Sequence, residues 1–265
     1  MWETVDPIVA WYRENKRDLP WRHDVTPYRV WVSEIMLQQT RVEAVKPYYD
    51  RFLKELPTIT DLANAKEDRL MKLWEGLGYY NRVRNMQKAA IQMVEQYGGQ
   101  FPESYEEIHA LTGIGNYTAG AIGSFAFGIP KPAVDGNVLR VVSRILASRE
   151  DIMKAKVRTA IETALEEVIP KDCPGDFNQG LIELGAIVCV PNGEPKCEIC
   201  PAAEICRAEK KESQWSFRSK QKQREEKSKR GRYLYFMTVI LWQFRNVRTK
   251  DFSRDYTNCR IWKAG

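Results

Sequence analysis

Long apolar runs are what this sequence of 265 residues most clearly lacks. The longest strongly apolar stretch, residues 233–242, is about half of what spanning a bilayer requires, so we expect no transmembrane helix and no membrane partner. The first ten residues include Glu3 and Asp6 and show no basic segment followed by an apolar one, which argues against a secretory signal. We therefore expect a cytoplasmic protein.

Glycine, proline and cysteine are also too sparse for a collagen-like, disordered or disulfide-stapled chain, with 16 Gly, 13 Pro and 6 Cys. Hydrophobic residues make up 43% and charged residues 29%, which suits one large or two small domains with a real core. Most of residues 1–206 shows helical apolar spacing broken by Gly or Pro, and nothing before residue 233 alternates like a half-buried strand. The sequence therefore predicts an all-α fold.

Excess positive charge is confined to the end of the chain. Residues 207–232 hold 11 basic and 4 acidic side chains, and residues 233–265 hold 6 and 2. The first 206 residues keep 24 of the 41 basic and 29 of the 35 acidic side chains, a net charge of −5. Nucleic-acid binding by this main body would depend on local features such as backbone amides and helix N-termini.

Four of the six cysteines lie close together, with the spacing C-x7-C-x2-C-x5-C. They are Cys189, Cys197, Cys200 and Cys206, whereas Cys173 and Cys259 stand apart. Four thiolates in one short loop can bind a single metal centre in a reducing compartment. One C-x-x-C flanked by lone cysteines favours a [4Fe–4S] cluster over structural zinc, which usually uses two short pairs. Zinc and free buried thiols are the alternatives.

A glycine pair, Gly113 and Gly115, separates two helical segments within residues 111–120. It is not a dinucleotide-binding motif, because position 118 is Thr and no strand precedes the pair. Backbone without Cβ atoms, next to the start of the helix that begins near Tyr117, can approach a DNA phosphate closely. An ordinary interhelical turn with a glycine cap is the alternative.

Two separated carboxylates are candidates for chemistry. Glu34 lies in an apolar segment and Asp135 stands before Gly136 and Asn137. Carboxyl groups in different environments can serve as an acid and as a charge stabiliser. The simpler alternatives are a solvated or paired Glu34 in the first turn of a helix, and an Asp135 that caps a helix beginning near Asn137.

Several long strings of this sequence are typical of one protein family. They are Leu-Pro-Trp at 19–21, Thr-Pro-Tyr at 26–28, residues 31–40, Gly-Leu-Gly-Tyr-Tyr at 76–80 with Arg82 and residues 84–85, the Gly113/Gly115 hairpin, Asp-Gly-Asn at 135–137 and Phe-Asn-Gln at 177–179. Through these strings nearly all of residues 1–206 resembles the helix-hairpin-helix DNA glycosylases, specifically the adenine DNA glycosylases of the MutY family.

The resemblance implies a six-helix barrel domain beside a [4Fe–4S] cluster domain, with the active site in the cleft between them. The implied bounds are 25–135 for the barrel, including the helix-hairpin-helix at about 105–127, and 1–24 with 136–206 for the cluster domain. Residues 207–232 would form a basic linker, and residues 233–265 a remnant of a C-terminal β-domain or a disordered tail. The four clustered cysteines would bind the cluster.

The resemblance also implies an activity. The chain would hydrolyse the N-glycosidic bond of adenine opposite 8-oxoguanine or guanine in double-stranded DNA, as a nucleoid-associated monomer. Glu34 would protonate the departing base, since a carboxyl group in a dry pocket can hold a proton near neutrality. Asp135, oriented by Asn137, would stabilise the oxocarbenium-like sugar. Tyr117 stands where bifunctional relatives such as endonuclease III have a lysine, so a monofunctional enzyme is expected.

Further residues match the family's base and DNA contacts. The adenine pocket would comprise Arg17, Trp21, Arg22, Leu37 and Gln179. The DNA contacts would be Gln38, Gln39, Thr40, Tyr79, Gly113 and Gly115. Of these, Gln39, Thr40 and Tyr79 would fill the gap that a flipped adenine leaves in the duplex. Core packing is the alternative role for Trp21, Leu37 and Tyr79.

Two features depart from the family pattern. The first gap between cysteines is one residue longer than the commonest family spacing. Family members also continue into a β-rich, Nudix-like domain that recognises 8-oxoguanine; residues 233–242 resemble its first strand, but residues 244–265 show no continuation. We expect a truncated, frameshifted or naturally short form that excises adenine with weakened preference for 8-oxoguanine. The alternatives are an endonuclease III-like enzyme acting on oxidised pyrimidines and a non-catalytic iron–sulfur DNA-binding module.

Overall fold

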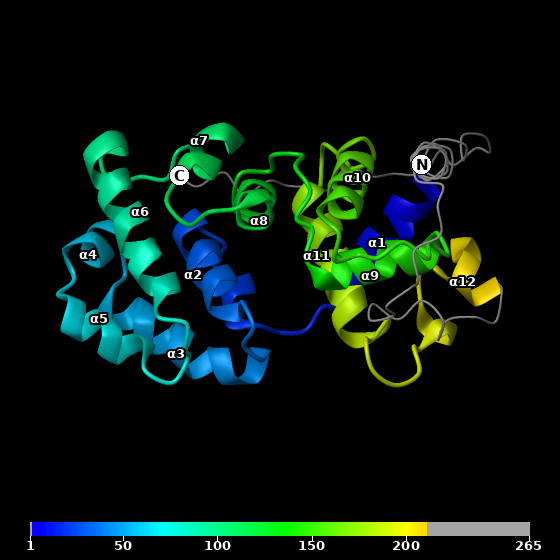
Figure 1. The fold of residues 1–265 in the computed structure, drawn as a ribbon, viewed down its shortest axis with the longest axis horizontal. Coiled ribbons are helices and arrows are strands. Elements are labelled where there is room, and N and C mark those ends of the chain that lie inside the picture. The colour runs from blue at the N-terminus through cyan, green and yellow to red at the C-terminus, as the bar shows by residue number, and fades with distance from the viewer. Residues whose placement is uncertain (1, 211–265) are drawn as a thin grey trace. The chain divides into compact units, whose positions relative to one another are not determined.

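The computed structural model describes residues 2–210, and every regular element in this range is a helix. The predicted all-α fold is confirmed. The strand expected at 233–242, most of the basic segment and Cys259 lie outside the described residues. None of the helices described is both long and apolar enough to cross a membrane. The described residues form two compact units: Arg17–Ala133, and residues 2–16 together with 134–210 (Figure 1).

The unit Arg17–Ala133 is built on one buried helix. Its elements are η1 (Pro20–Arg22), α2 (Pro27–Leu37), α3 (Val42–Glu55), α4 (Ile59–Asn64), α5 (Glu67–Trp74), α6 (Asn81–Tyr97), α7 (Tyr105–Ala110) and α8 (Asn116–Ala126). Helix α2 packs against α3 and α8, and α6 packs against α4 and α5. The aromatic pairs Trp31–Phe101 and Phe52–Trp74 meet edge to face in this core, with ring centroids 5.4 and 5.9 Å apart.

Local signals fix where α2 begins. Thr26 caps the helix by accepting a hydrogen bond from the Arg29 N–H at 3.3 Å, and Pro27 occupies the first position, where its missing N–H costs nothing. From Val30 to Met36 every side chain is buried, so α2 is covered on all sides. A polar residue in this stretch, such as Glu34, is therefore held away from water.

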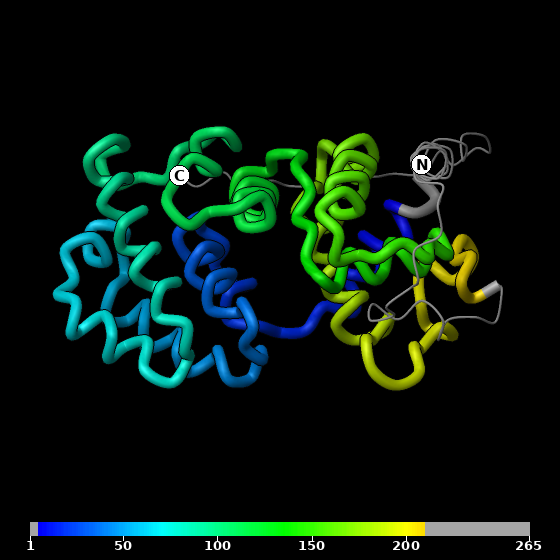
Figure 2. Tube along the Cα trace, viewed as in Figure 1, coloured from blue at the N-terminus to red at the C-terminus, as the bar shows by residue number. Residues whose placement is uncertain are grey.

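The second unit joins the N-terminal helix to the last described helices. Its elements are α1 (Trp2–Asn15), α9 (Gly136–Ile145), α10 (Ala155–Glu166), α11 (Pro174–Ile187), η2 (Cys197–Ile199), η3 (Ala203–Ile205) and α12 (Arg207–Lys210). The blue α1 and the yellow-green α11 of Figure 2 pack together although they are distant in the sequence. A Cβ atom at Gly180 would lie 2.8 Å from Cγ2 of Ile8, so glycine is what lets α1 and α11 approach closely.

Candidate active site

A buried carboxyl–hydroxyl pair links α2 to α8. Glu34 lies in the interior of α2 and is only 7% exposed. The Tyr117 hydroxyl, at the start of α8, donates a hydrogen bond of 2.5 Å to Oε2 of Glu34. This distance lies at the short end of the range for O–H···O hydrogen bonds. Glu34 is therefore neither solvated nor in a first helical turn, and the structure brings these two predicted site residues into direct contact.

A glycine hairpin joins α7 to α8. Gly113 has a φ of +79°, and a Cβ atom there would lie 2.7 Å from Cβ of Asn85. At Gly115, by contrast, nothing lies within 4 Å of the position a Cβ would take. Among the residues described, neither glycine N–H donates a hydrogen bond. Gly113 thus meets a structural requirement, and the loop also offers donors that an anion could bind.

Two predicted DNA-contacting residues have unusual backbone conformations. Gln39, just after α2, has a φ of +60°, and Tyr79, just before α6, has a φ of +48°. Positive φ is uncommon outside glycine and asparagine and is often found at functional sites. The Tyr79 side chain is 66% exposed, so its alternative role in core packing is wrong. The neighbours Gln38 and Thr40 are half-buried, and the Thr40 hydroxyl donates to the Gln38 carbonyl at 3.4 Å.

Four of the predicted adenine-pocket residues lie in the unit Arg17–Ala133. Trp21 is buried and its ring packs edge to face on Tyr49, with centroids 5.5 Å apart. Leu37 is half-buried against the same core, so core packing accounts for both Trp21 and Leu37 in this structure. Arg22 donates from Nη1 to the Arg17 carbonyl at 2.9 Å, which fixes the segment around η1.

The fifth pocket residue, Gln179, belongs to α11 in the other unit. Its Oε1 accepts a hydrogen bond of 2.8 Å from the hydroxyl of Tyr12, which is buried in α1. In this arrangement the amide oxygen of Gln179 faces the hydroxyl and accepts from it. The donor end of the Gln179 amide, Nε2, then points away from Tyr12.

Asp135 is the N-cap of α9. Its Oδ1 accepts from the Val138 N–H at 2.9 Å and its Oδ2 accepts from Nδ2 of Asn137 at 2.6 Å. The capping role considered from the sequence is thus present, and the predicted neighbour Asn137 contacts the carboxyl group directly. Burial raises the pKa of Asp135, while the hydrogen bonds from Val138 and Asn137 act in the opposite direction.

Two buried arginines of α9 were missed by the sequence analysis. Arg140 donates from Nη2 to Oδ1 of Asn137 at 2.9 Å and from Nε to the Cys189 carbonyl at 2.9 Å. Arg144 donates from Nη1 to Sγ of Cys189 at 3.2 Å and to the Val190 carbonyl at 3.0 Å. Basic residues four apart on an otherwise apolar helix face were the signal that could have found them, since buried charge needs partners.

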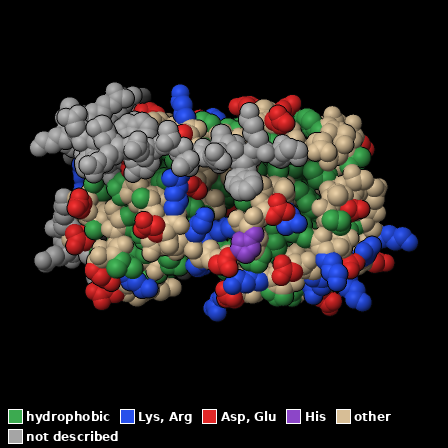
Figure 3. Space-filling view, turned by 180° about the vertical axis from the view of Figure 1, so that it is seen from behind, with side chains coloured by type: hydrophobic (Ala, Val, Ile, Leu, Met, Phe, Trp, Pro, Cys, Tyr) green, Lys and Arg blue, Asp and Glu red, His purple; other side chains and the backbone are tan. Residues whose placement is uncertain are grey.

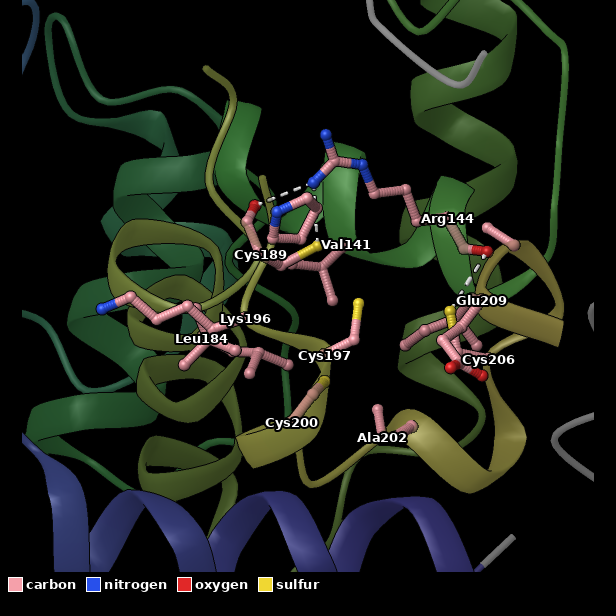
Figure 4. A pocket seen from close by; sticks show the side chains of 15 residues that line it. Val141, Arg144, Leu184, Cys189, Lys196, Cys197, Cys200, Ala202, Cys206 and Glu209 are labelled. Carbon is pink, nitrogen blue, oxygen red and sulfur yellow. Dashed lines mark hydrogen bonds between the residues drawn. The ribbon is translucent and has the colours of Figure 1, made fainter. Parts of the chain in front are cut away.

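The four clustered cysteines line one cavity of the second unit (Figure 4). Cys189 follows α11, Cys197 begins η2, Cys200 follows η2, and Cys206 follows η3. Val141, Leu184 and Ala202 contribute apolar walls. Burial raises the pKa of Cys200 to about 12, and the neighbouring thiols contribute to the rise. In residues 2–210 no group of three or more His, Cys, Asp or Glu is arranged to hold a metal ion. Cys173 lies outside the cavity.

The face of the molecule seen in Figure 3 carries side chains of both charges. On the side of the molecule seen in Figure 3, Lys and Arg side chains are interspersed with Asp and Glu. This mixture agrees with the net charge of −5 for the first 206 residues. Contact with a polyanion in this part of the chain can draw on the local donors described above.

Comparison with known proteins identifies the family. Residues 32–170 match the family described as HhH-GPD superfamily base excision DNA repair protein. The adenine DNA glycosylase of Rattus norvegicus is 43% identical over 216 residues, which cover 78% of this chain and 42% of the relative. The adenine DNA glycosylase of Buchnera aphidicola subsp. Schizaphis graminum (strain Sg) is 37% identical over 257 residues, covering 97% of this chain and 71% of the relative. The chain thus spans about two fifths of the length of the rat relative.

Solved structures share the fold. A thermostable thymine-DNA glycosylase superposes with a TM-score of 0.71 at 31% identity, covering 78% of this chain and 95% of that one. A trapped endonuclease III–DNA covalent intermediate gives 0.65 at 25% identity, covering 79% and 95%. The expected helix-hairpin-helix glycosylase fold is confirmed. The chain belongs to the HhH-GPD superfamily of base excision DNA repair proteins and, within it, to the adenine DNA glycosylase family.

Proposed function

We propose that this chain excises adenine opposite 8-oxoguanine or guanine from double-stranded DNA by hydrolysing the N-glycosidic bond. The buried contact between Glu34 and Tyr117 carries the proposal, because it places an acid in an apolar interior and fixes its orientation. The relatives of the chain that are named adenine DNA glycosylases support adenine as the base. Endonuclease III-like action on oxidised pyrimidines is disfavoured, since the hairpin helix carries Tyr117 and no lysine there.

Glu34 is assigned the role of general acid. Adenine leaves slowly unless its ring is protonated as the glycosidic bond lengthens, and a positioned carboxylic acid supplies that proton. The hydrogen bond from Tyr117 to Oε2 restricts rotation of the carboxyl group, so the acid stays oriented within α2. After the proton has moved to the base, the same hydroxyl stabilises the carboxylate that is left.

Asp135 is assigned the stabilisation of the positive charge that develops on the sugar. Only the ionised carboxylate can do this, either electrostatically or by forming a transient covalent bond. The hydrogen bonds from Val138 and Asn137 favour the ionised form against the effect of burial. Asn137 in turn is held by Arg140, so the carboxylate is oriented by a chain of hydrogen bonds within its own unit.

The proposed enzyme is monofunctional. A phenol cannot form the imine through which lysine-bearing glycosylases cleave the strand. The product would be an abasic site in an intact strand, and borohydride should not trap the protein on DNA. Efficient borohydride trapping would contradict this part of the proposal.

DNA would be bound by local backbone donors and by inserted side chains. The hairpin amides at Gly113 and Gly115 would bind phosphates, and Gln39, Thr40 and Tyr79 would fill the gap left by the flipped adenine. Gln179 would donate from Nε2 to a ring nitrogen of the base, which its contact with Tyr12 makes possible. We further propose that the protein acts as a monomer on nucleoid DNA in the cytoplasm.

We also propose that Cys189, Cys197, Cys200 and Cys206 hold a [4Fe–4S] cluster. The donor types fit such a group, because four thiols and apolar walls line one cavity and Arg144 directs an N–H toward Sγ of Cys189. In the described residues the thiols do not yet converge on a common metal position, so the loop would have to close around the cluster. A bound cluster would cross-link the loop 189–206 through these four cysteines. Iron and zinc analysis of the purified protein separates this proposal from a zinc site.

A single gel assay tests the proposed activity. A duplex with adenine opposite 8-oxoguanine is incubated with the full chain and analysed with and without alkali. Nicking that requires alkali supports adenine excision without strand cleavage. Nicking without alkali would indicate a bifunctional enzyme, and binding without any nicking would indicate a non-catalytic DNA-binding module. A duplex with guanine opposite adenine, assayed in parallel, measures the preference for 8-oxoguanine.

A further inference from the structure

The guanidinium group of Arg82 binds backbone carbonyls of two separate segments. Arg82 is the second residue of α6. From Nη1 it donates to the carbonyls of Ile35 at 2.6 Å, Met36 at 3.3 Å and Gln38 at 2.7 Å. From Nη2 it donates to the carbonyls of Leu77 at 3.0 Å and Gly78 at 3.3 Å. One side chain therefore joins the end of α2 to the loop that precedes α6.

The positive charge of Arg82 is balanced by dipoles and rings. The carbonyls at the C-terminal end of α2 carry the negative end of the helix dipole. The guanidinium carbon lies 5.5 Å from the ring centroid of Trp74 and 5.7 Å from that of Tyr79, within the range of cation–π attraction. No Asp or Glu in the described part of the chain forms an ion pair with Arg82. No ionic partner competes with the two backbone segments for this side chain.

Each of the two segments joined by Arg82 contains a residue with positive φ. The bound carbonyls of Gln38 and Gly78 immediately precede Gln39 and Tyr79, whose φ values are +60° and +48°. Such conformations persist only where the surroundings enforce them. The carbonyls of Ile35 and Met36 also directly follow Glu34 in α2. The same guanidinium thus touches the backbone beside both strained residues and beside the proposed acid.

A cavity beside this contact gives the backbone room to relax. It has a volume of about 140 Å³ and is bordered by Gln38, Arg82 and the hairpin residue Gly113, among others. If the guanidinium were replaced by a group with fewer directed donors, the segment after α2 could shift into this space. Tight packing alone does not hold the segment in place.

We propose that Arg82 is a positioning residue that holds the two DNA-inserting segments in register with the acid-bearing end of α2, and so enables extrusion of a paired adenine. This inference rests on the proposed function. Lysine cannot replace Arg82, because a single ammonium group lacks the planar fork that reaches both segments at once. Loss of the fork should impair opening of the base pair more than it impairs binding to DNA.

The test compares R82K with R84K in the full chain. Arg84 is a matched control, since it lies on the same helix, is exposed and pairs with Glu67 at 3.2 Å. The probe is a duplex with 2′-fluoro-adenosine opposite 8-oxoguanine, which resists cleavage, and 2-aminopurine as the neighbouring base. Fluorescence of 2-aminopurine rises when the target base leaves the stack. Single-turnover excision is measured on the matching unmodified duplex.

We expect wild type and R84K to give the same fluorescence rise and the same excision rate. For R82K we expect most of the rise to be lost and excision to slow by about tenfold or more, because small displacements at a reacting site are costly. Its DNA affinity should change by no more than about threefold, because phosphate contacts dominate affinity. Equal fluorescence and equal rates for R82K and wild type would overturn the inference.

A measurement of folding distinguishes variants that misfold from variants that fold but lose activity. Circular dichroism measures the folded fraction of each variant. The second variant is R82Q, whose single amide nitrogen carries two N–H donors and no charge. If neither R82K nor R82Q folds, Arg82 serves global folding and the inference is overturned. If wild type gives the fluorescence rise and R82K does not, but wild type releases no adenine, the inference about Arg82 stands and the proposed function is wrong.

Discussion

The carboxyl groups of Glu34 and Asp135 are held in place by opposite means. Glu34 sits in the middle of a helix, and its hydroxyl partner Tyr117 lies 83 residues further along the chain. Asp135 starts a helix and is bound by Val138 and Asn137, three and two residues away. The position of Glu34 therefore depends on how α2 packs against α8, whereas Asp135 depends mainly on the geometry of its own helix start. Substitutions that disturb helix packing should therefore affect Glu34, and substitutions at the start of α9 should affect Asp135.

The largest effect is expected for Glu34→Gln. The amide keeps an oxygen that can accept from Tyr117, so the packing of α2 on α8 should persist. It cannot supply a proton, and single-turnover excision should fall by about 10²–10⁴, the usual contribution of a general acid. Binding to the same duplex should be unchanged. The control is Glu43→Gln, an exposed residue of α3 paired with Lys46. Wild-type rates for Glu34→Gln would refute the assignment.

The next largest effect tests the packing of α8, the helix that carries Tyr117. A Cβ atom at Gly120 would lie 2.1 Å from the Pro132 carbonyl oxygen, a backbone atom that cannot move aside easily. Gly120→Ala should lower the free energy of unfolding by about 1–3 kcal/mol through overpacking. Gly123→Ala in the same helix meets only Ile129 at 3.5 Å and should raise stability by up to about 1 kcal/mol. Thermal melts of both variants measure the difference; equal melting temperatures would contradict it.

A smaller effect is expected when the local support of Asp135 is removed. Asn137 donates to Oδ2 and thereby lowers the pKa of Asp135, so Asn137→Ala should raise that pKa further. Because the ionised form is the active one, the rate falls as pH drops through this pKa, and the acid limb of the pH–rate profile should move to higher pH. At weakly acid pH the loss should be about tenfold, the worth of a hydrogen bond to a charged group. Asn64→Ala, at the exposed end of α4, is the control. An unmoved acid limb would show that Asn137 does not act through Asp135.

Features of the site that depend on neighbouring residues could be predicted from the sequence, whereas contacts between distant segments could not. The cap at Asp135 could be predicted, because N-cap preferences are read from adjacent residues. The common cavity of the four cysteines could be anticipated from their spacing. The glycine hairpin could also be predicted, although only the structure shows that Gly113 is required by Asn85 and that Gly115 faces open space.

Contacts between distant segments could not be predicted from the sequence pattern. The contact of Glu34 with Tyr117 follows from the packing of α2 on α8, and only the family resemblance had indicated that both residues belong to the site. The five carbonyl contacts of Arg82 leave no trace in the sequence, since backbone acceptors carry no residue identity. Likewise, nothing local indicates that Tyr12 orients Gln179.

The smallest effect is expected for Tyr12→Phe. This substitution removes a hydrogen bond between residues that are distant in the sequence but belong to the same unit as Asp135. The Tyr12 hydroxyl donates to Oε1 of Gln179 at 2.8 Å, and this hydrogen bond favours the orientation in which Nε2 is available as a donor. Without the hydroxyl the amide can turn over, and part of the population would present oxygen to an acceptor nitrogen of adenine. Excision should slow by about fivefold, the worth of one neutral hydrogen bond, while the pH–rate profile keeps its position because Asp135 and Asn137 are untouched. Tyr97→Phe, at the end of α6, is the control. A displaced pH–rate profile in Tyr12→Phe would mean that the long-range contact between Tyr12 and Gln179 also influences the ionisation of Asp135. Asp135 would then depend on distant residues as Glu34 does.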